Sequence, residues 1–94
     1  MQIIDILGTK YVIEYMDEVI LDNELVGGLC NFKDKQIHIS TDESGDPERI
    51  LRHEVAHAFL YESGLGYYAG DETLVEWIAI QLPKIVKALD NIKE

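Results

Sequence analysis

The sequence predicts an α+β fold in which a small antiparallel sheet of three or four strands is followed by two helices. Short segments that alternate apolar and polar residues, separated by turn residues, occupy the first 40 positions. Two longer segments with the 3.6-residue periodicity of helices occupy the rest of the chain. With 94 residues and 47% apolar content, we expect one domain over residues 1–94 with a single modest core.

The predicted strands are joined by short polar turns. Gly8-Thr9-Lys10 has the length of a hairpin turn, and Lys33-Asp34-Lys35 joins a second pair of strands. Asp22-Asn23-Glu24, between the two pairs, is predicted to be a loop, and Asp42–Pro47 leads into the first helix. The four predicted strands are Gln2–Leu7, Tyr11–Met16, Leu29–Phe32 and Gln36–Ser40.

The first helix has start and stop signals. Asp46 is suited to cap it, Pro47 to occupy its first position, and Glu48 to complement the dipole of its first turn. Gly64 and Gly66 mark its end. Apolar residues cover most of its circumference, so we expect it to be largely buried. They are Leu51, Val55, Ala56, Ala58, Phe59 and Leu60.

This helix contains His53-Glu54-Val55-Ala56-His57, an H-E-x-x-H motif. Four positions are about one helical turn, so both imidazoles leave the same face and can bind one metal ion. Glu54 beside them can act on a water molecule that the metal holds, as in a zinc peptidase. With Tyr61 these residues form a polar stripe that would be costly in a buried helix, and metal coordination would stabilise it. The alternative is one hydrogen-bonded core histidine beside a half-exposed one.

A zinc site of this kind needs a third protein ligand, with water in the fourth position. His38 alternates with Ile37 and Ile39 in a predicted strand, so we expect it to face solvent on the side away from the core. Cys30 is the single cysteine and has no Cys-x-x-Cys partner, so a small buried thiol is the simpler interpretation. The sequence therefore favours neither residue as the third ligand.

Two acids at the start of the second helix are better candidates. Asp71 is its predicted cap, and Glu72 and Glu76 follow His57 by 15 and 19 residues. Glu72 borders the apolar stripe of this helix, whereas Glu76 lies about 40° further towards solvent. We therefore predict Glu72 as the ligand and Glu76 as the partner of a histidine ring, although each could be an ordinary first-turn carboxylate. The stripe comprises Leu74, Val75, Ile78, Ala79, Leu82, Ile85, Val86 and Leu89.

Pro83 lies inside this second helical segment. Proline has no backbone N–H and its ring clashes with the preceding turn, so we expect a kink there or a new helix that starts near Lys84.

The run Leu51–Phe59, followed by Asp71–Glu76, resembles the short zincin-type (H-E-x-x-H) metallopeptidases of bacteriophages and mobile elements. Those proteins are similar to the anti-repressor metallopeptidases and, more distantly, to gluzincins, which pair H-E-x-x-H with a glutamate on the next helix. Gly28–Ser40 also resembles the strand pair that precedes the family's active-site helix, so the resemblance covers roughly residues 26–82. Gluzincins often have Asn-Glu where this chain has Asp71-Glu72. The resemblance implies a minimal zincin-like domain with zinc ligands His53, His57 and Glu72 and the catalytic base Glu54.

Charge restricts the classes of partner. The chain has 8 basic and 18 acidic residues, a formal charge of −10, so it would repel nucleic acid and an anionic membrane surface. A basic peptide would be attracted, although acidity also serves solubility. We expect neither a membrane span, which needs about 20 apolar residues, nor a leader peptide. The single cysteine cannot form an internal disulfide, which favours the cytoplasm.

Together these features predict a cytoplasmic zinc metallopeptidase with a peptide or protein substrate. Zn²⁺ would lower the pKa of its water towards about 7, and Glu54 would accept the proton and pass it to the leaving amine. The substrate would add as a strand near Gln36–Ser40. Candidate stabilisers of the oxyanion, with packing roles as the alternative, are Tyr61, Tyr67 and Tyr68.

Another class of function stays open. The chain could be a catalytically silent interaction module, with or without zinc, or a pro-form whose open zinc position is blocked by a neighbouring chain. The sequence leaves the cleavage specificity and the oligomeric state open.

Overall fold

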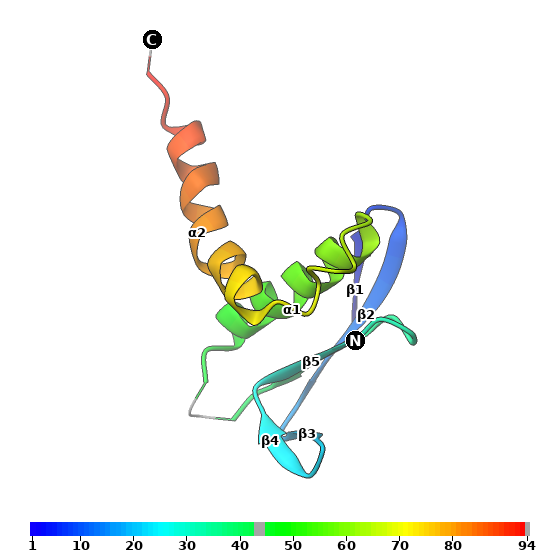
Figure 1. Cartoon of the computed structure of the whole chain (residues 1–94). Helices are drawn as coiled ribbons and strands as arrows, with labels where there is room; N and C mark the ends of the chain where they lie inside the picture. Colours follow the sequence, from blue (N-terminus) through cyan, green and yellow to red (C-terminus); the bar gives the residue numbers. More distant parts are fainter. Residues whose placement is uncertain (43–44, 94) are drawn as a thin grey trace.

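A computed structural model describes residues 1–42 and 45–93. Two residues of the predicted loop Asp42–Pro47, numbers 43 and 44, lie outside the described residues. The described chain has an α+β fold with a small mixed sheet and two helices (Figure 1). Its elements are β1 Gln2–Ile6, β2 Thr9–Met16, β3 Val19–Leu21, β4 Glu24–Val26, β5 Gly28–Asn31, β6 Gln36–Ser40, α1 Pro47–Glu62 and α2 Glu72–Asp90.

The main sheet has four strands in the order β1-β2-β6-β5. The hairpins β1-β2 and β5-β6 are antiparallel, as predicted, but β2 and β6 pair in parallel, from Val12↔Gln36 to Met16↔Ser40. The prediction of a purely antiparallel sheet is therefore wrong at this junction. β6 carries the fully buried Ile37 and Ile39, and a strand so well buried belongs in the interior of the sheet, next to β2.

Two of the connections differ from the predicted turns. The first hairpin turns at Leu7 and Gly8, which both have positive φ, so Thr9 already belongs to β2. Asp22 and Asn23 also have positive φ, as expected of a tight two-residue hairpin turn, and they join β3 to β4. The segment predicted as a loop is therefore the turn of a second, two-stranded sheet, whose strands of three residues each are too short to show a clear alternation in the sequence.

Helix α1 lies between the sheet and α2 (Figure 1). Its start follows the prediction, since Pro47 is its first residue and the Asp46 side chain accepts hydrogen bonds from the backbone N–H groups of residues 48 and 49. Ala58 packs against the sheet and Ala56 against α2, but Phe59, predicted to belong to the buried surface, is exposed. The sheet-side core comprises Ile6, Tyr11, Ile13, Ile37, Ile39 and Ala58.

Helix α2 continues through Pro83 as one helix, so no new helix starts near Lys84. A proline at this position leaves the carbonyl of Ala79 without its usual N–H donor. Arg52 of α1 replaces that donor, because its Nε donates to the Ala79 oxygen at 3.2 Å.

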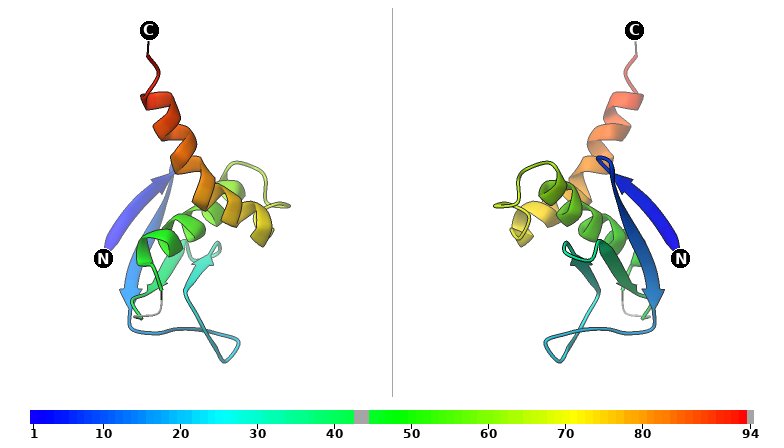
Figure 2. Two further views of the ribbon diagram at one scale, coloured as in Figure 1. Left: turned by 90° about the vertical axis from the view of Figure 1, so that its left-hand side faces the viewer. Right: turned by 90° about the vertical axis from the view of Figure 1, so that its right-hand side faces the viewer.

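Only the first half of α2 is packed. Leu74, Val75 and Ile78 contact the second core, whereas the stripe residues from Leu82 onwards are exposed. Figure 2 shows this second half projecting away from α1 and the sheet. Among the described residues, neither helix is long and apolar enough to cross a membrane.

Candidate metal centre

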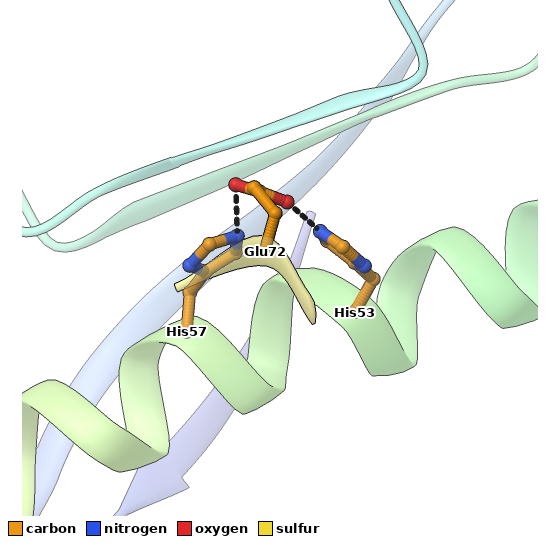
Figure 3. Close-up of side chains that lie close together, drawn as sticks. All are labelled: His53, His57 and Glu72. Carbon is orange, nitrogen blue, oxygen red and sulfur yellow. Dashed lines mark hydrogen bonds and ion pairs between the residues drawn. The ribbon is translucent and has the colours of Figure 1, made fainter. Parts of the chain in front are cut away.

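The three residues predicted as ligands converge at the crossing of the two helices (Figure 3). His53 and His57 leave α1 one turn apart, and Glu72 is the first residue of α2. The two oxygens of Glu72 lie 2.9 Å from His53 Nε2 and 3.2 Å from His57 Nε2. Among the described residues, these three offer ligand atoms that all lie within 4.8 Å of one another, and they could hold a metal ion.

The other nitrogen of each ring is already engaged. His57 Nδ1 contacts the carbonyl oxygen of Ala69, and because a carbonyl only accepts, Nδ1 carries the proton. His53 Nδ1 lies 3.5 Å from an oxygen of Glu76, the residue predicted as a histidine partner. Contacts of ring nitrogens with carbonyl and carboxylate oxygens orient the ligating histidines in metal sites.

This arrangement of protons is suited to a cation. In a neutral His57 ring whose Nδ1 donates, Nε2 presents a lone pair to a carboxylate oxygen of Glu72. Two lone pairs at 3.2 Å repel each other unless a proton or a cation lies between them. Ligands about 2.0–2.1 Å from a tetrahedral ion lie roughly 3.3 Å apart, close to the two separations between Glu72 and the histidines.

Glu54 is buried beside this group without belonging to it. Its side chain lies against β5 at Gly28, where an added Cβ would stand 2.9 Å from Glu54 Oε2. Burial raises the pKa of the Glu54 carboxyl, the two histidines oppose that shift, and Glu72 adds to it. A carboxyl with a raised pKa is suited to accepting and returning a proton.

The proposed ligands and Glu54 line one groove of about 490 Å³ between β5, α1 and α2. Arg49 also lines it and binds Glu76, with Nη1 2.8 Å from Oε1, which holds the pKa of the Glu76 carboxyl below its usual range. Arg49 was not predicted from the sequence, although its place one turn before His53 puts it on the same face of α1.

The other candidates from the sequence lie elsewhere or play other parts. His38 is half-buried in the interior strand β6, and neither it nor Cys30 belongs to the candidate ligand group found among the described residues. Cys30 lines the groove as a thiol whose pKa burial raises to about 12, with Glu54 adding to the rise.

The three tyrosines predicted to stabilise an oxyanion do not line this groove. Tyr61 stacks on Phe32 with ring centroids 4.3 Å apart, which is the packing alternative. Tyr67 and Tyr68 contact each other edge to face and are exposed. Among the described residues that line the groove, Arg49 is the one besides the two histidines whose side chain has N–H donors, which an oxyanion would need.

Comparison of the chain with protein-family models, with curated proteins and with solved structures finds no match. The function of the site therefore has to follow from its own residues and geometry.

Proposed function

We propose that this protein is a small zinc-dependent metallopeptidase with the minimal zincin-like arrangement that its sequence resembles. The observation that carries the proposal is the position of Glu72, which lies against the Nε2 atoms of both motif histidines while their Nδ1 atoms are engaged elsewhere. Two imidazoles and one carboxylate are a common ligand set of catalytic zinc. Glu54, buried in the same groove outside that set, supports hydrolysis over a purely structural site.

Each residue of the site has a role in this proposal. His53, His57 and Glu72 would hold the ion, which when bound lowers the pKa of a water molecule and polarises the substrate carbonyl. Glu54 accepts a proton in the first step and returns it to the leaving amine, which its raised pKa favours. Glu76 and the carbonyl of Ala69 keep the rings oriented. Arg49 is positioned to donate to a substrate oxygen.

The substrate of this proposal is an extended peptide that pairs with β5. The site of strand addition predicted from the sequence, Gln36–Ser40, is wrong, because β6 is an interior strand and both of its edges are paired. β5 is the free edge beside the groove. Ser40 N donates to Gly27 O, so the alternation of an antiparallel ladder directs the backbone groups of Gly28 and Cys30 away from β6.

The proposal is tested by metal analysis together with peptide hydrolysis. We expect about one zinc per chain, lost in Glu72→Gln but retained in Glu76→Gln with about ten- to a hundredfold weaker affinity. Glu54→Gln should keep the zinc and lose hydrolysis of a mixture of unstructured basic peptides. Glu48→Gln, an exposed acid of the same helix, is the matched control and should cleave normally. Wild-type hydrolysis by Glu54→Gln would contradict the enzymatic proposal.

A catalytically silent zinc-binding interaction module is the second candidate. The exposed apolar half of α2 favours it, because such surfaces commonly contact other proteins. In that case zinc binding would persist and no peptide would be cleaved by the wild-type protein.

A further inference from the structure

The second half of α2 exposes large apolar side chains that a monomer would leave in water. Leu82, Ile85 and Leu89 are 47%, 43% and 61% exposed, and Val86 beside them is 50% exposed. We call these four residues the α2 seam. Both views in Figure 2 show this part of α2 standing clear of the sheet and of α1. Contiguous exposed apolar surface of this kind marks an interaction site.

The spacing of the seam is that of a coiled coil. Apolar residues follow one another at alternating steps of three and four along α2, the repeat with which two helices pack side by side. Val75 and Ile78, at the start of the series, pack against α1, and the seam continues the same face beyond the end of that contact. The full series is Val75, Ile78, Leu82, Ile85 and Leu89.

The seam is also free of charge in a strongly acidic chain. Lys84 and Lys87 project from the side opposite the seam by helical periodicity. Gln81 and Ala88 flank the seam on one side, and Pro83 and Asp90 flank it on the other. Two copies with a formal charge of −10 each repel over most of their surface, but can approach along this face with Asp90 as the one acid at its edge.

The accessible surface of the chain is larger than that of a compact monomer of the same mass, as expected of a chain without its partner. Its accessible surface is 6690 Å², whereas a compact monomer of 10.7 kDa would expose about 5,500 Å². The excess of roughly 1,200 Å² is spread over the whole chain, and the α2 seam contributes part of it towards the area of about 800 Å² that each partner buries in a standard interface. The radius of gyration, 14.1 Å, likewise exceeds the value of about 12.4 Å for a compact domain of this length.

We propose that the α2 seam pairs with the seam of a second copy to form an antiparallel homodimer. Antiparallel packing puts the two acidic bodies at opposite ends of the helix pair, whereas parallel packing would put them side by side. In this arrangement Leu82 of one copy faces Leu89 of the other. The dimer does not depend on the proposed hydrolysis, and Glu54→Gln should pair like the wild type.

The mass in solution tests the pairing. Light scattering during size-exclusion chromatography should give twice the mass of 10.7 kDa, decreasing towards the monomer on dilution. Ile85→Glu and Leu89→Glu should give the monomer mass with unchanged helical circular dichroism, since both side chains are exposed in the single chain. Lys87→Gln, with the same change of net charge on the opposite side, should remain dimeric. A wild-type protein that is monomeric at its highest soluble concentration would overturn the proposal, even if the seam bound a different protein or a lipid vesicle.

Disulfide trapping tests the orientation. In a Cys30→Ser background, Leu82→Cys and Leu89→Cys proteins should form a disulfide dimer when mixed and oxidised, but not separately. A disulfide dimer of either protein alone would show parallel pairing and overturn the antiparallel arrangement.

Discussion

At the scale of single residues, Gly28 determines where the Glu54 carboxylate can lie. A Cβ at this position would stand 2.7 Å from Ile50 Cγ2 and 2.9 Å from Glu54 Oε2, closer than real Cβ atoms approach. Because β5 has glycine there, α1 can press a buried carboxylate against the strand that we propose as the substrate edge. The absence of a side chain at Gly28 therefore allows both the packing of α1 on β5 and the position of the Glu54 carboxylate.

We predict that Gly28→Ala displaces Glu54 and lowers kcat by at least about tenfold, since small misplacements of a catalytic group are costly. The overpacked contact with Ile50 should also lower the free energy of unfolding by about 1–3 kcal/mol. Peptide hydrolysis, zinc content and urea unfolding measure these effects, and zinc content should stay the same. Gly66→Ala is the control, because an added Cβ there meets only Tyr61 Cδ1, at 3.9 Å, and Gly66 does not line the groove. Equal activity of the two variants would argue against a positioning role for Gly28.

Much of the candidate site could be predicted because its signals are local. The spacing of His53 and His57 and the border position of Glu72 are readable from helical periodicity, and these three side chains do converge. That they bind zinc stays a prediction. Gly28 and Ala69 could not be foreseen, since their contacts depend on how close β5 and the α1–α2 loop come to α1.

At the scale of elements, α2 remains one helix through Pro83 because α1 supplies a donor. Arg52 Nε donates to the Ala79 carbonyl that proline leaves free, so the helix that carries the predicted ligand is tied to the helix that carries the motif. The sequence predicted a kink at Pro83 or a new helix near Lys84, because a replacement donor 27 positions away cannot be read from the local pattern.

We predict that Arg52→Leu lowers the free energy of unfolding by about 1–2 kcal/mol, since it leaves a helical carbonyl without a protein donor. In a Pro83→Ala background the backbone N–H of residue 83 can donate to the Ala79 carbonyl, so Arg52→Leu should lower the free energy of unfolding by less. A double-mutant cycle measured by urea unfolding gives the difference. Additive effects would show that the Arg52 side chain does not compensate for the proline.

The end of α1 is held to the sheet by another polar contact. Glu62 accepts hydrogen bonds from Thr9, Tyr11 and Lys35, with Lys35 Nζ at 2.8 Å and the Tyr11 hydroxyl at 2.7 Å. The Lys35 and Tyr11 hydrogen bonds lower the pKa of the Glu62 carboxyl, while burial and Glu62 raise the pKa of Tyr11. A carboxyl whose pKa is lowered by folding stabilises the folded state in its charged form.

We predict that the stabilisation by Glu62 is present above the unfolded pKa of about 4.3 and is lost as the pH falls through its lower folded pKa. Glu62→Gln should therefore reduce the free energy of unfolding at pH 7, and its difference from the wild type should shrink below about pH 4. Urea unfolding at a series of pH values measures this. Lys35→Met removes the principal partner and should reproduce much of the effect. A difference that grows as the pH falls would refute the assignment.

The two hairpins of the main sheet were predictable from the sequence, but the pairing between the hairpins was not. Each hairpin follows from its own alternation and turn, so β1-β2 and β5-β6 were predictable. The parallel pairing of β2 with β6 joins residues about 24 positions apart in sequence. The alternation of a strand shows which of its faces is buried, but not which other strand lies beside it. The edge strand was therefore misassigned, and with it the strand proposed to bind substrate.

At the scale of the whole molecule, two apolar clusters meet through α1 and neither contains a proposed ligand. One joins α1 to the sheet, and the other joins it to α2, Phe32 and Ala69. The candidate site lies at the edge of the second cluster, where His53 is half-buried and Glu72 is exposed. The fold is therefore expected to form without metal, and binding should add stability to a structure that already exists.

We predict that removal of metal with a chelator leaves the far-ultraviolet circular dichroism unchanged and lowers the Tm. Zinc at about a hundredfold above its Kd stabilises by about 2.7 kcal/mol, which for a domain of this size corresponds to roughly 10–20 °C. Differential scanning calorimetry across a zinc titration measures the shift. Glu72→Gln should show little of it, because two imidazoles alone bind the ion weakly. Loss of helical signal on chelation would mean that the metal holds the fold together, and a Tm independent of zinc would mean that this crossing of α1 and α2 binds none.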